Sequence, residues 1–387
     1  RHLTFRTLAG SSWAWLDDPS YQGEYDWAQS INLILLRLLS FSLDCHASLV
    51  RKATADCQGA VVAPSSPSTG THPVPQCRRY SFLHGLSHAF YAPVVLAGPT
   101  IGFDDFREQC AAPRATCGRL GWYLGQLLLA LVALEAGIHA YPCFALARSG
   151  QLGQQGPRLG AAAVFLTLNL MWLKFLVLWR VARAWALAEG IDVPENMTRA
   201  LCNHYSLVGF WRCWHASFNR WLVRYIYVPA GGRDHKALAA AVTFAFVALW
   251  HDAEAKLMAW GALNALFLAL ETLVTRAWQR KTGHLASKWP WVHRQLGALG
   301  GTSYIMVLMA VNMIGYSVGI GGISRLLATA ASTRVEAMRT VLGAYMVLFS
   351  GVQVMLEIRH LDGTWAAKSP AVAPTLPDAS PGGDKQV

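Results

Sequence analysis

The stretch from Gly209 to Asp252 carries most of the information about fold and function. It reads GFWRCWHASFNRWLVRYIYVPAGGRDHKALAAAVTFAFVALWHD. Two histidines stand near its ends: His215 lies among aromatic residues and arginines, and His251 closes the uncharged run 237–250. Ionisable side chains at membrane depth are costly, and they mark functional sites by default. An apolar run that ends in a histidine and an acid therefore makes these two histidines the first candidates for chemistry.

The composition of the whole chain is typical of a membrane protein. Of its 387 residues, 53% are hydrophobic, 16 are tryptophan and only 14% are charged, against roughly 25% charged residues in soluble domains. The several long apolar runs predict an all-α, polytopic transmembrane bundle. The formal charge of +11 suits anionic lipid headgroups or a phosphorylated ligand. Nucleic acid is excluded as a partner, because the basic residues flank or interrupt hydrophobic segments and form no soluble basic face.

The cysteine pattern supports no metal site. The 8 cysteines form no C-x-x-C pair, the spacing typical of zinc sites and of thioredoxin-like redox motifs. We expect free thiols, with disulfides as the alternative, and neither a metal nor a cofactor.

Four parts can be distinguished along the chain. Residues 1–50 form an amino-terminal lumenal or interfacial segment with a first membrane helix, whose apolar part (27–44) is marginal for a full span and suits a re-entrant or interfacial helix. Residues 51–79 form a flexible loop rich in proline and serine, 80–358 the membrane core, and 359–387 a disordered tail. We expect about eight membrane helices with extra interfacial ones. Since residue 1 is arginine and no signal pattern follows, we also expect a fragment that lacks its upstream part.

Glycine and proline residues mark two ends of predicted elements. The helix expected over 159–187 should stop at Gly190 and Pro194, in accord with the usual helix stop signals. Gly231 and Gly232 should end the element that contains His215.

The segment 209–227, placed on a single helix, separates into three faces. An aromatic face, within an arc of about 80°, holds Trp211, Trp214, Phe218 and Trp221. The adjoining face holds Arg212, His215 and Asn219, and a third holds Arg220 and Arg224. This pattern is compatible with an interfacial helix with aromatic anchors and snorkelling arginines. It is also compatible with a site for an amphiphile, in which aromatic rings contact an acyl chain and arginines contact phosphate.

His251 also admits two interpretations. A histidine followed by Asp252 could simply lie at the water interface. An imidazole, whose unperturbed pKa is near 6.5, is also suited to taking a proton from a hydroxyl group near neutral pH. Glu135 and Lys174 are weaker candidates, since each is better explained as a helix-packing or boundary charge.

Several motifs resemble those of the membrane-bound O-acyltransferase (MBOAT) superfamily. The main ones are F-W-R-x-W-H-x-S-F-N-R-W-x-x-R-Y-I-Y-x-P-x-G-G, over 210–232, and L-W-H-D, over 249–252. Supporting matches are Tyr21-Gln22-Gly23, Leu36-Arg37-Leu38-Leu39-Ser40-Phe41, Tyr91-Ala92-Pro93 with Gly98-Pro99, and Met171-Trp172-Leu173-Lys174-Phe175. The resemblance covers roughly residues 20–358 without the 51–77 loop, and is strongest to the branch with the fungal glycerol-uptake protein and hedgehog acyltransferase. Ala230 stands where that branch usually has leucine, a mild departure in the turn.

The resemblance implies roles for individual residues and a fold. His251 matches the catalytic histidine of the family, and His215 matches its second polar position. Supporting or substrate-binding positions are Asn219, Trp211, Trp214, Arg212, Arg220 and Asp252. The implied fold is a helical bundle with re-entrant or interfacial helices around a central acyl-transfer chamber, and the family's amino-terminal helices are missing from this chain.

The resemblance further implies an acyl-CoA-dependent acyltransferase with no cofactor besides this co-substrate. The acceptor expected from the branch is the hydroxyl group of a lyso-GPI-anchor lipid, or a GPI-anchored acceptor, in the endoplasmic reticulum membrane. One alternative is palmitoylation of a protein amino terminus, as in hedgehog acyltransferase. Two others are a glycerol transporter and a non-catalytic regulator. A transporter does not require the two-histidine motif, and no inverted repeat is evident in the sequence. A non-catalytic relative would have lost the catalytic histidine, whereas this chain keeps both His215 and His251.

Overall fold

All regular structure in the described part of the chain is helical. The computed structural model describes residues 12, 27–57, 80–114, 117–151, 156–251, 254–330 and 334–368. Its helices are, in chain order, α2 (Trp27–Cys57), α3 (Phe82–Ala89), α4 (Ala92–Val95), α5 (Phe103–Ala111), α6 (Cys117–Ala140), α7 (Cys143–Arg148), α8 (Pro157–Ala188), η5 (Leu201–Asn203), α9 (Leu207–Cys213), α10 (Ala216–Leu222), η6 (Val223–Tyr227), α11 (Lys236–His251), α12 (Ala255–Lys288), α13 (Pro290–Tyr316), α14 (Gly319–Ala330) and α15 (Arg334–Lys368). These ranges contain no strand, and the predicted all-α class is confirmed.

Six helices are long and apolar enough to cross a membrane. The candidate spans are Ile31–Arg51, Gly118–Ala140, Arg158–Ala188, Ala255–Lys288, Pro290–Tyr316 and Arg334–Leu361. The predicted number of about eight is therefore too high for the described residues. The segment 80–103 accounts for part of the difference: it folds as two short helices, α3 and α4, where Pro93 and the pair Gly98-Pro99 interrupt the apolar sequence.

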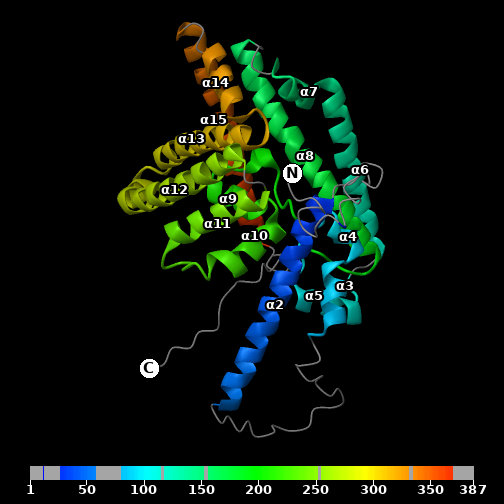
Figure 1. Cartoon of the computed structure of the whole chain (residues 1–387). Helices are drawn as coiled ribbons and strands as arrows, with labels where there is room; N and C mark the ends of the chain where they lie inside the picture. Colours follow the sequence, from blue (N-terminus) through cyan, green and yellow to red (C-terminus); the bar gives the residue numbers. More distant parts are fainter. Residues whose placement is uncertain are drawn as a thin grey trace.

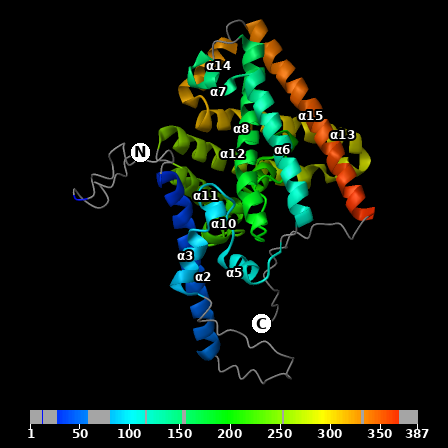
Figure 2. The same ribbon diagram turned by 90° about the vertical axis from the view of Figure 1, so that its right-hand side faces the viewer.

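The helices surround a group of short central elements (Figures 1 and 2). On one side α6 packs along α8; on the other α12 packs along α13, which in turn contacts α15. The short elements α9, α10, η6 and α11 lie between these two groups, with α11 packed on α12. The lower half of α2 extends beyond the bundle, and α3 and α5 lie beside it. The segment with both candidate histidines thus lies at the centre of the fold.

Two boundaries differ from those expected from the sequence. α2 continues to Cys57, so residues 51–57 are helical rather than part of the expected loop, and Ile31–Arg51 is a candidate span rather than a re-entrant segment. α15 continues to Lys368, which makes 359–368 helical instead of disordered. Neither extension contains proline, and the prolines of the tail begin at residue 370. The remaining parts of the expected loop and tail, 58–79 and 369–387, lie outside the described residues.

Gly190 ends α8, as the sequence predicted. It has a left-handed φ of +87°, which glycine adopts at little cost. Its N–H donates to the Leu187 carbonyl at 3.1 Å, and the Ile191 N–H donates to the Ala186 carbonyl at 2.9 Å. These bonds close the helix and turn the chain into the extended loop 191–200, which leads back to the centre of the bundle.

Candidate active site

His215 interrupts the helix that the sequence predicted over 209–227. α9 ends at Cys213, and His215 has φ 45° and ψ 49° before α10 begins at Ala216. Among the described residues it is the only non-glycine residue with a positive φ, a conformation that costs an L-residue roughly 1–2 kcal/mol. The π-helical turn η6 follows α10. The prediction of one continuous helix is therefore wrong, and so are the three faces derived from it.

A large, partly open cavity lies where the central elements meet the long helices. Its volume is about 1450 Å³, more than the roughly 300–1,000 Å³ usual for a small-molecule site. Residues of α2, α8, α9, α10, α11, α12, α13 and α15 line it. His215 and His251 both belong to this lining, so folding brings the two predicted histidines to one space.

An aromatic wall connects the two histidines. The ring of His215 lies 4.4 Å from that of Trp179 and 5.1 Å from that of Phe218, measured between centroids. Phe218 lies 4.7 Å from Trp250, whose ring is 4.8 Å from His251. This wall offers an apolar surface along the whole path between the two imidazoles.

The His215 imidazole is neutral and has a polar atom without a partner. Burial lowers the pKa of His215, and a positive charge on nearby His251 lowers it further. Its buried Nδ1 atom makes no hydrogen bond within the described part of the chain. A buried, unpartnered polar atom is costly, and this one belongs to a residue of the cavity lining.

The surroundings of His251 are aromatic. The ring centroids of Tyr316 and Trp260 lie 5.6 Å and 6.3 Å from that of the His251 imidazole. On the opposite side, the Asn32 side-chain amide donates to the Trp250 carbonyl at 3.2 Å. The end of α11 is thus fixed by contacts with α2, α12 and α13, while the imidazole keeps accessible surface in the cavity.

Most of the predicted supporting residues face the same cavity. Its lining includes Trp211, Arg212, Trp214 and Asn219. Arg220, the neighbour of Asn219 on α10, is not part of the lining. Asp252 lies outside the described residues. For all these positions the catalytic or binding role stays a prediction.

Several cavity residues were missed in the sequence. His204 is a third histidine of the lining, with its ring 5.7 Å from Phe210. Asn32 and Tyr316 also reach the cavity. His204 lies shortly before His215 in the sequence, which was an available signal, whereas nothing in the local sequence distinguishes Asn32 or Tyr316.

The charged side chains that line the cavity are all basic. They are Arg212, Arg233, Lys236 and Arg276, and no aspartate or glutamate is among the described lining residues. α11 and α12 run antiparallel after their short connection, so Arg276 lies towards the end of α11 that carries Lys236. With 16 residues, α11 separates this end from His251 by about 24 Å at ~1.5 Å per residue.

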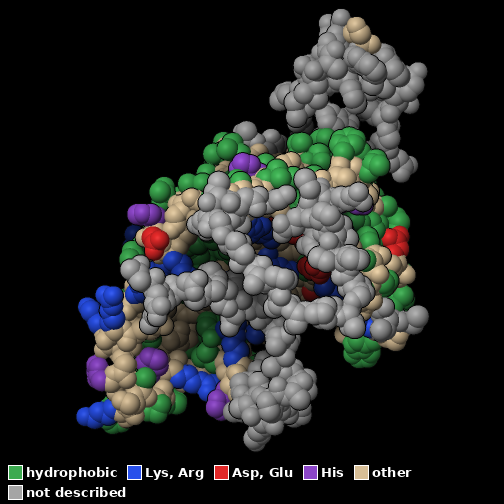
Figure 3. Space-filling view, turned by 90° about the horizontal axis from the view of Figure 1, so that it is seen from below, with side chains coloured by type: hydrophobic (Ala, Val, Ile, Leu, Met, Phe, Trp, Pro, Cys, Tyr) green, Lys and Arg blue, Asp and Glu red, His purple; other side chains and the backbone are tan. Residues whose placement is uncertain are grey.

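Basic side chains are also visible at the surface (Figure 3). Lys and Arg gather on the left of this view, where the outer ends of α12 and α13 lie in Figure 1. Within the described ranges, no group of three His, Cys, Asp or Glu side chains could hold a metal ion.

These features define a class: a polytopic helical membrane protein with two histidines at one large cavity. The chain belongs to the membrane-bound O-acyltransferase family, whose model matches residues 8–311. The family membership that the sequence motifs indicated is thereby confirmed.

Three relatives illustrate the similarity. The membrane-bound O-acyltransferase gup1 of Schizosaccharomyces pombe is 37% identical over 344 residues, which cover 86% of this chain and 58% of the relative. GUP1 of Saccharomyces cerevisiae is 34% identical over 345 residues, 86% of this chain and 60% of its own length. The protein-cysteine N-palmitoyltransferase HHAT of Mus musculus is 30% identical over 272 residues, or 64% of this chain and 52% of its own. The chain thus spans less than two thirds of the length of each of these relatives.

Proposed function

We propose that the protein transfers a long-chain fatty acyl group from acyl-CoA to a hydroxyl group of a membrane acceptor. The observation that carries the proposal is the shared cavity. Aromatic rings connect His215 and His251 along its wall, and the charged side chains of its described lining are all basic. Membership in the membrane-bound O-acyltransferase family supports the same reaction.

In the proposed reaction His251 is the general base. Its imidazole takes the proton of the acceptor hydroxyl while the oxygen attacks the thioester carbonyl carbon. Negative charge then develops on the carbonyl oxygen, and we assign its stabilisation by hydrogen bonding to His215, with Asn219. The intermediate collapses as the carbon–sulfur bond breaks. The His251 imidazolium returns its proton to the departing thiolate, so the products are an ester and CoA with a free thiol.

The cavity suits an acyl-CoA donor in two ways. A thiolate, with a parent pKa near 8.5, is a good leaving group and needs no metal to assist it. The aromatic and aliphatic lining can hold the acyl chain, while Arg233, Lys236 and Arg276 can contact phosphate groups. Because these cations lie about 24 Å along α11 from His251, the phosphates would be held well away from the reacting carbonyl, as the long arm of CoA requires.

For the acceptor we propose a lyso-GPI lipid in the endoplasmic reticulum membrane. The support is the resemblance to the fungal branch, whose members gup1 and GUP1 match 86% of this chain. A second candidate is acylation of a protein amino terminus. It is favoured by the 30% identity with the mouse protein-cysteine N-palmitoyltransferase, although that match covers only 64% of the chain.

The proposal can be tested with the full-length protein in endoplasmic-reticulum-type membranes. Labelled long-chain acyl-CoA and a lyso-GPI lipid are supplied to the wild type and to His251→Ala, with folded protein quantified by size-exclusion chromatography. We expect label on the lipid with the wild type alone. Label on a protein instead of the lipid would favour acylation of a protein amino terminus. If the well-folded wild type transferred label to no acceptor, the proposed reaction would be refuted.

A further inference from the structure

We propose that Asn196 is a positioning residue that fixes the left-handed backbone of His215, and that an ion-pair cluster around Arg183 holds Asn196 in place. This inference rests on the proposed function, because it concerns how His215 is presented to the cavity. It assigns a task to a loop that has no residue in the cavity lining.

The turn at His215 requires support from outside its own helix. His215 is the N-cap residue of α10, and its side chain makes no capping hydrogen bond. The first N–H groups of any helix lack partners within that helix. A left-handed histidine followed by unsatisfied N–H groups would relax into another conformation unless other residues bound this backbone.

Asn196 supplies the missing partners. Its carbonyl accepts the Ala216 N–H at 3.0 Å, and its side-chain oxygen accepts the Ser217 N–H at 3.1 Å. The same side-chain oxygen accepts the Ser217 hydroxyl at 2.5 Å, and that hydroxyl accepts the Thr100 N–H at 2.8 Å. The Asn196 side chain is completely buried. The two residues that follow His215 are thus bound by one residue of another loop: Ala216 by the backbone carbonyl of Asn196, and Ser217 by its side-chain oxygen.

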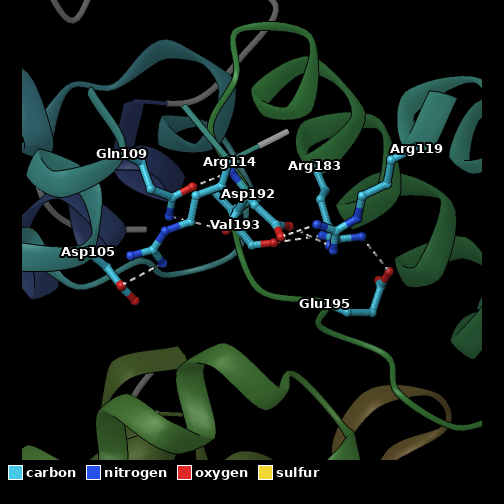
Figure 4. Close-up of polar contacts among 8 residues, drawn as sticks. All are labelled: Asp105, Gln109, Arg114, Arg119, Arg183, Asp192, Val193 and Glu195. Atoms are coloured by element: carbon cyan, nitrogen blue, oxygen red, sulfur yellow. Dashed lines mark hydrogen bonds and ion pairs between the residues drawn. The ribbon is translucent and has the colours of Figure 1, made fainter. Parts of the chain in front are cut away.

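That loop is itself bound at several points. Arg183, on α8, donates through Nε to the Val193 carbonyl at 2.6 Å and through Nη2 to Asp192 at 2.7 Å. Its Nη1 reaches Glu195 at 3.4 Å. Figure 4 shows this guanidinium beside both carboxylates. Asp192, Val193 and Glu195, which it binds, directly precede Asn196 in the sequence.

Three further side chains complete the cluster. Arg119 donates to the second oxygen of Asp192 at 2.6 Å, and the Tyr123 hydroxyl donates to Glu195 at 3.0 Å. The Gln109 side-chain oxygen accepts the Asp192 N–H at 2.7 Å. Residues of α5, α6 and α8 therefore meet on the segment 192–195, which connects Gly190 to Asn196. None of these side chains lines the cavity, so their effect on chemistry would pass through Asn196 to His215.

The test compares Asn196→Ala, Asn196→Asp and a control in the full-length protein, reconstituted in lipid nanodiscs. Asn196→Ala removes the side-chain oxygen, so we expect kcat to fall about 10- to 100-fold, the effect of misplacing a catalytic group by about 1 Å, with KM for acyl-CoA unchanged. Asn196→Asp keeps an oxygen at this position and should recover most of the loss. The control is Thr302→Ala, which removes a different buried hydrogen bond, to the Ala298 carbonyl, and should leave kcat at the wild-type value.

A second readout does not depend on turnover. Diethyl pyrocarbonate modifies accessible imidazoles, and mass spectrometry can follow His215 with His251 as internal reference. We expect Asn196→Ala to change the modification rate of His215 relative to His251, and Asn196→Asp to restore the wild-type ratio. An inactive wild type would refute the proposed reaction, while this ratio would still decide the positioning role.

Two results would overturn the inference. One is a wild-type kcat together with a wild-type His215 modification ratio in Asn196→Ala. The other is a loss of kcat that follows the melting temperature equally in Asn196→Ala and Thr302→Ala, which would indicate general destabilisation. If Asn196→Ala fails to fold, Ser217→Ala takes its place, because it removes only the hydrogen bonds of the Ser217 hydroxyl. This variant must lose less kcat than predicted for Asn196→Ala and must change the modification ratio of His215 to His251 in the same direction.

Discussion

The left-handed backbone of His215 restricts which side chains can replace it. Asparagine tolerates this conformation better than most L-residues, and its amide can still donate a hydrogen bond, whereas alanine offers neither property. His215→Ala should therefore lower kcat by about 10²–10³-fold, the usual effect of losing one oxyanion donor. His215→Asn should keep a clearly larger part of the activity. Equal losses in steady-state assays of the two variants would contradict this prediction, because they would show that tolerance of the left-handed backbone and an amide donor do not replace the imidazole.

His204 should make the stability of the cavity region depend on pH. Burial lowers the pKa of His204 to about 4, and the charges of Arg359 and Arg199 contribute, whereas the unfolded value is near 6.5. The unfolded state therefore binds more protons between these values. The stability contributed by neutral His204 is complete above about pH 6.5 and is lost as pH falls towards 4, by up to about 1.4 kcal/mol per pH unit.

Melting temperatures between pH 7 and pH 5 can check this behaviour. His204→Gln should show a shallower decline than the wild type. His284→Gln, at an exposed histidine near the end of α12, serves as the matched control and should decline like the wild type. Parallel curves for all three proteins would refute the prediction for His204.

At the scale of single elements, the end of α8 governs the path of the loop towards the site. Gly190 has a positive φ, and a Cβ atom built there would lie 2.9 Å from Pro113. Gly190→Ala should therefore destabilise the protein by about 1–2 kcal/mol or more. Gly121→Ala is the matched control, since this helical glycine has open space around it and alanine favours helix by up to about 1 kcal/mol. Thermal unfolding should move in opposite directions for the two variants, and a stabilising Gly190→Ala would contradict the structure.

The helices could largely be predicted from sequence because apolar length and stop signals are local properties. Gly190 ends α8 where expected, and His251 ends the apolar helix α11 as the composition of 237–250 implied. Local signals were less reliable where neither proline nor glycine stops a helix. This explains why α2 and α15 run past their predicted ends.

The break at His215 could not be predicted because its cause is not local. Helical periodicity assumes a continuous helix over 209–227, whereas Asn196 binds the backbone after His215 from another part of the chain. Tyr316 and Asn32 were missed for a related reason, since only the packing of α13 and α2 against α11 brings them to the cavity.

In the whole molecule, basic side chains from separate segments line the cavity, and no aspartate or glutamate is among its described lining residues. Arg276→Ala should raise KM for acyl-CoA roughly tenfold, equivalent to about 1.5 kcal/mol for a hydrogen bond to a charged group, with little change in kcat. The effect should shrink at high salt. Arg280→Ala provides the comparison, because this arginine is on the same helix but outside the cavity lining. Equal KM values for the two variants would show that the lining cations do not contact the donor.

A double-variant cycle shows whether His215 and His251 act on the same reacting atoms in one cavity. Single-turnover acyl transfer is measured for wild type, His215→Ala, His251→Ala and the double variant, with melting temperatures as a check on folding. Residues that act as a unit are strongly non-additive, so the double variant should be no slower than His251→Ala alone. Losses that multiply, or a His251→Ala protein that transfers acyl groups at the wild-type rate, would show that the two histidines do not act together.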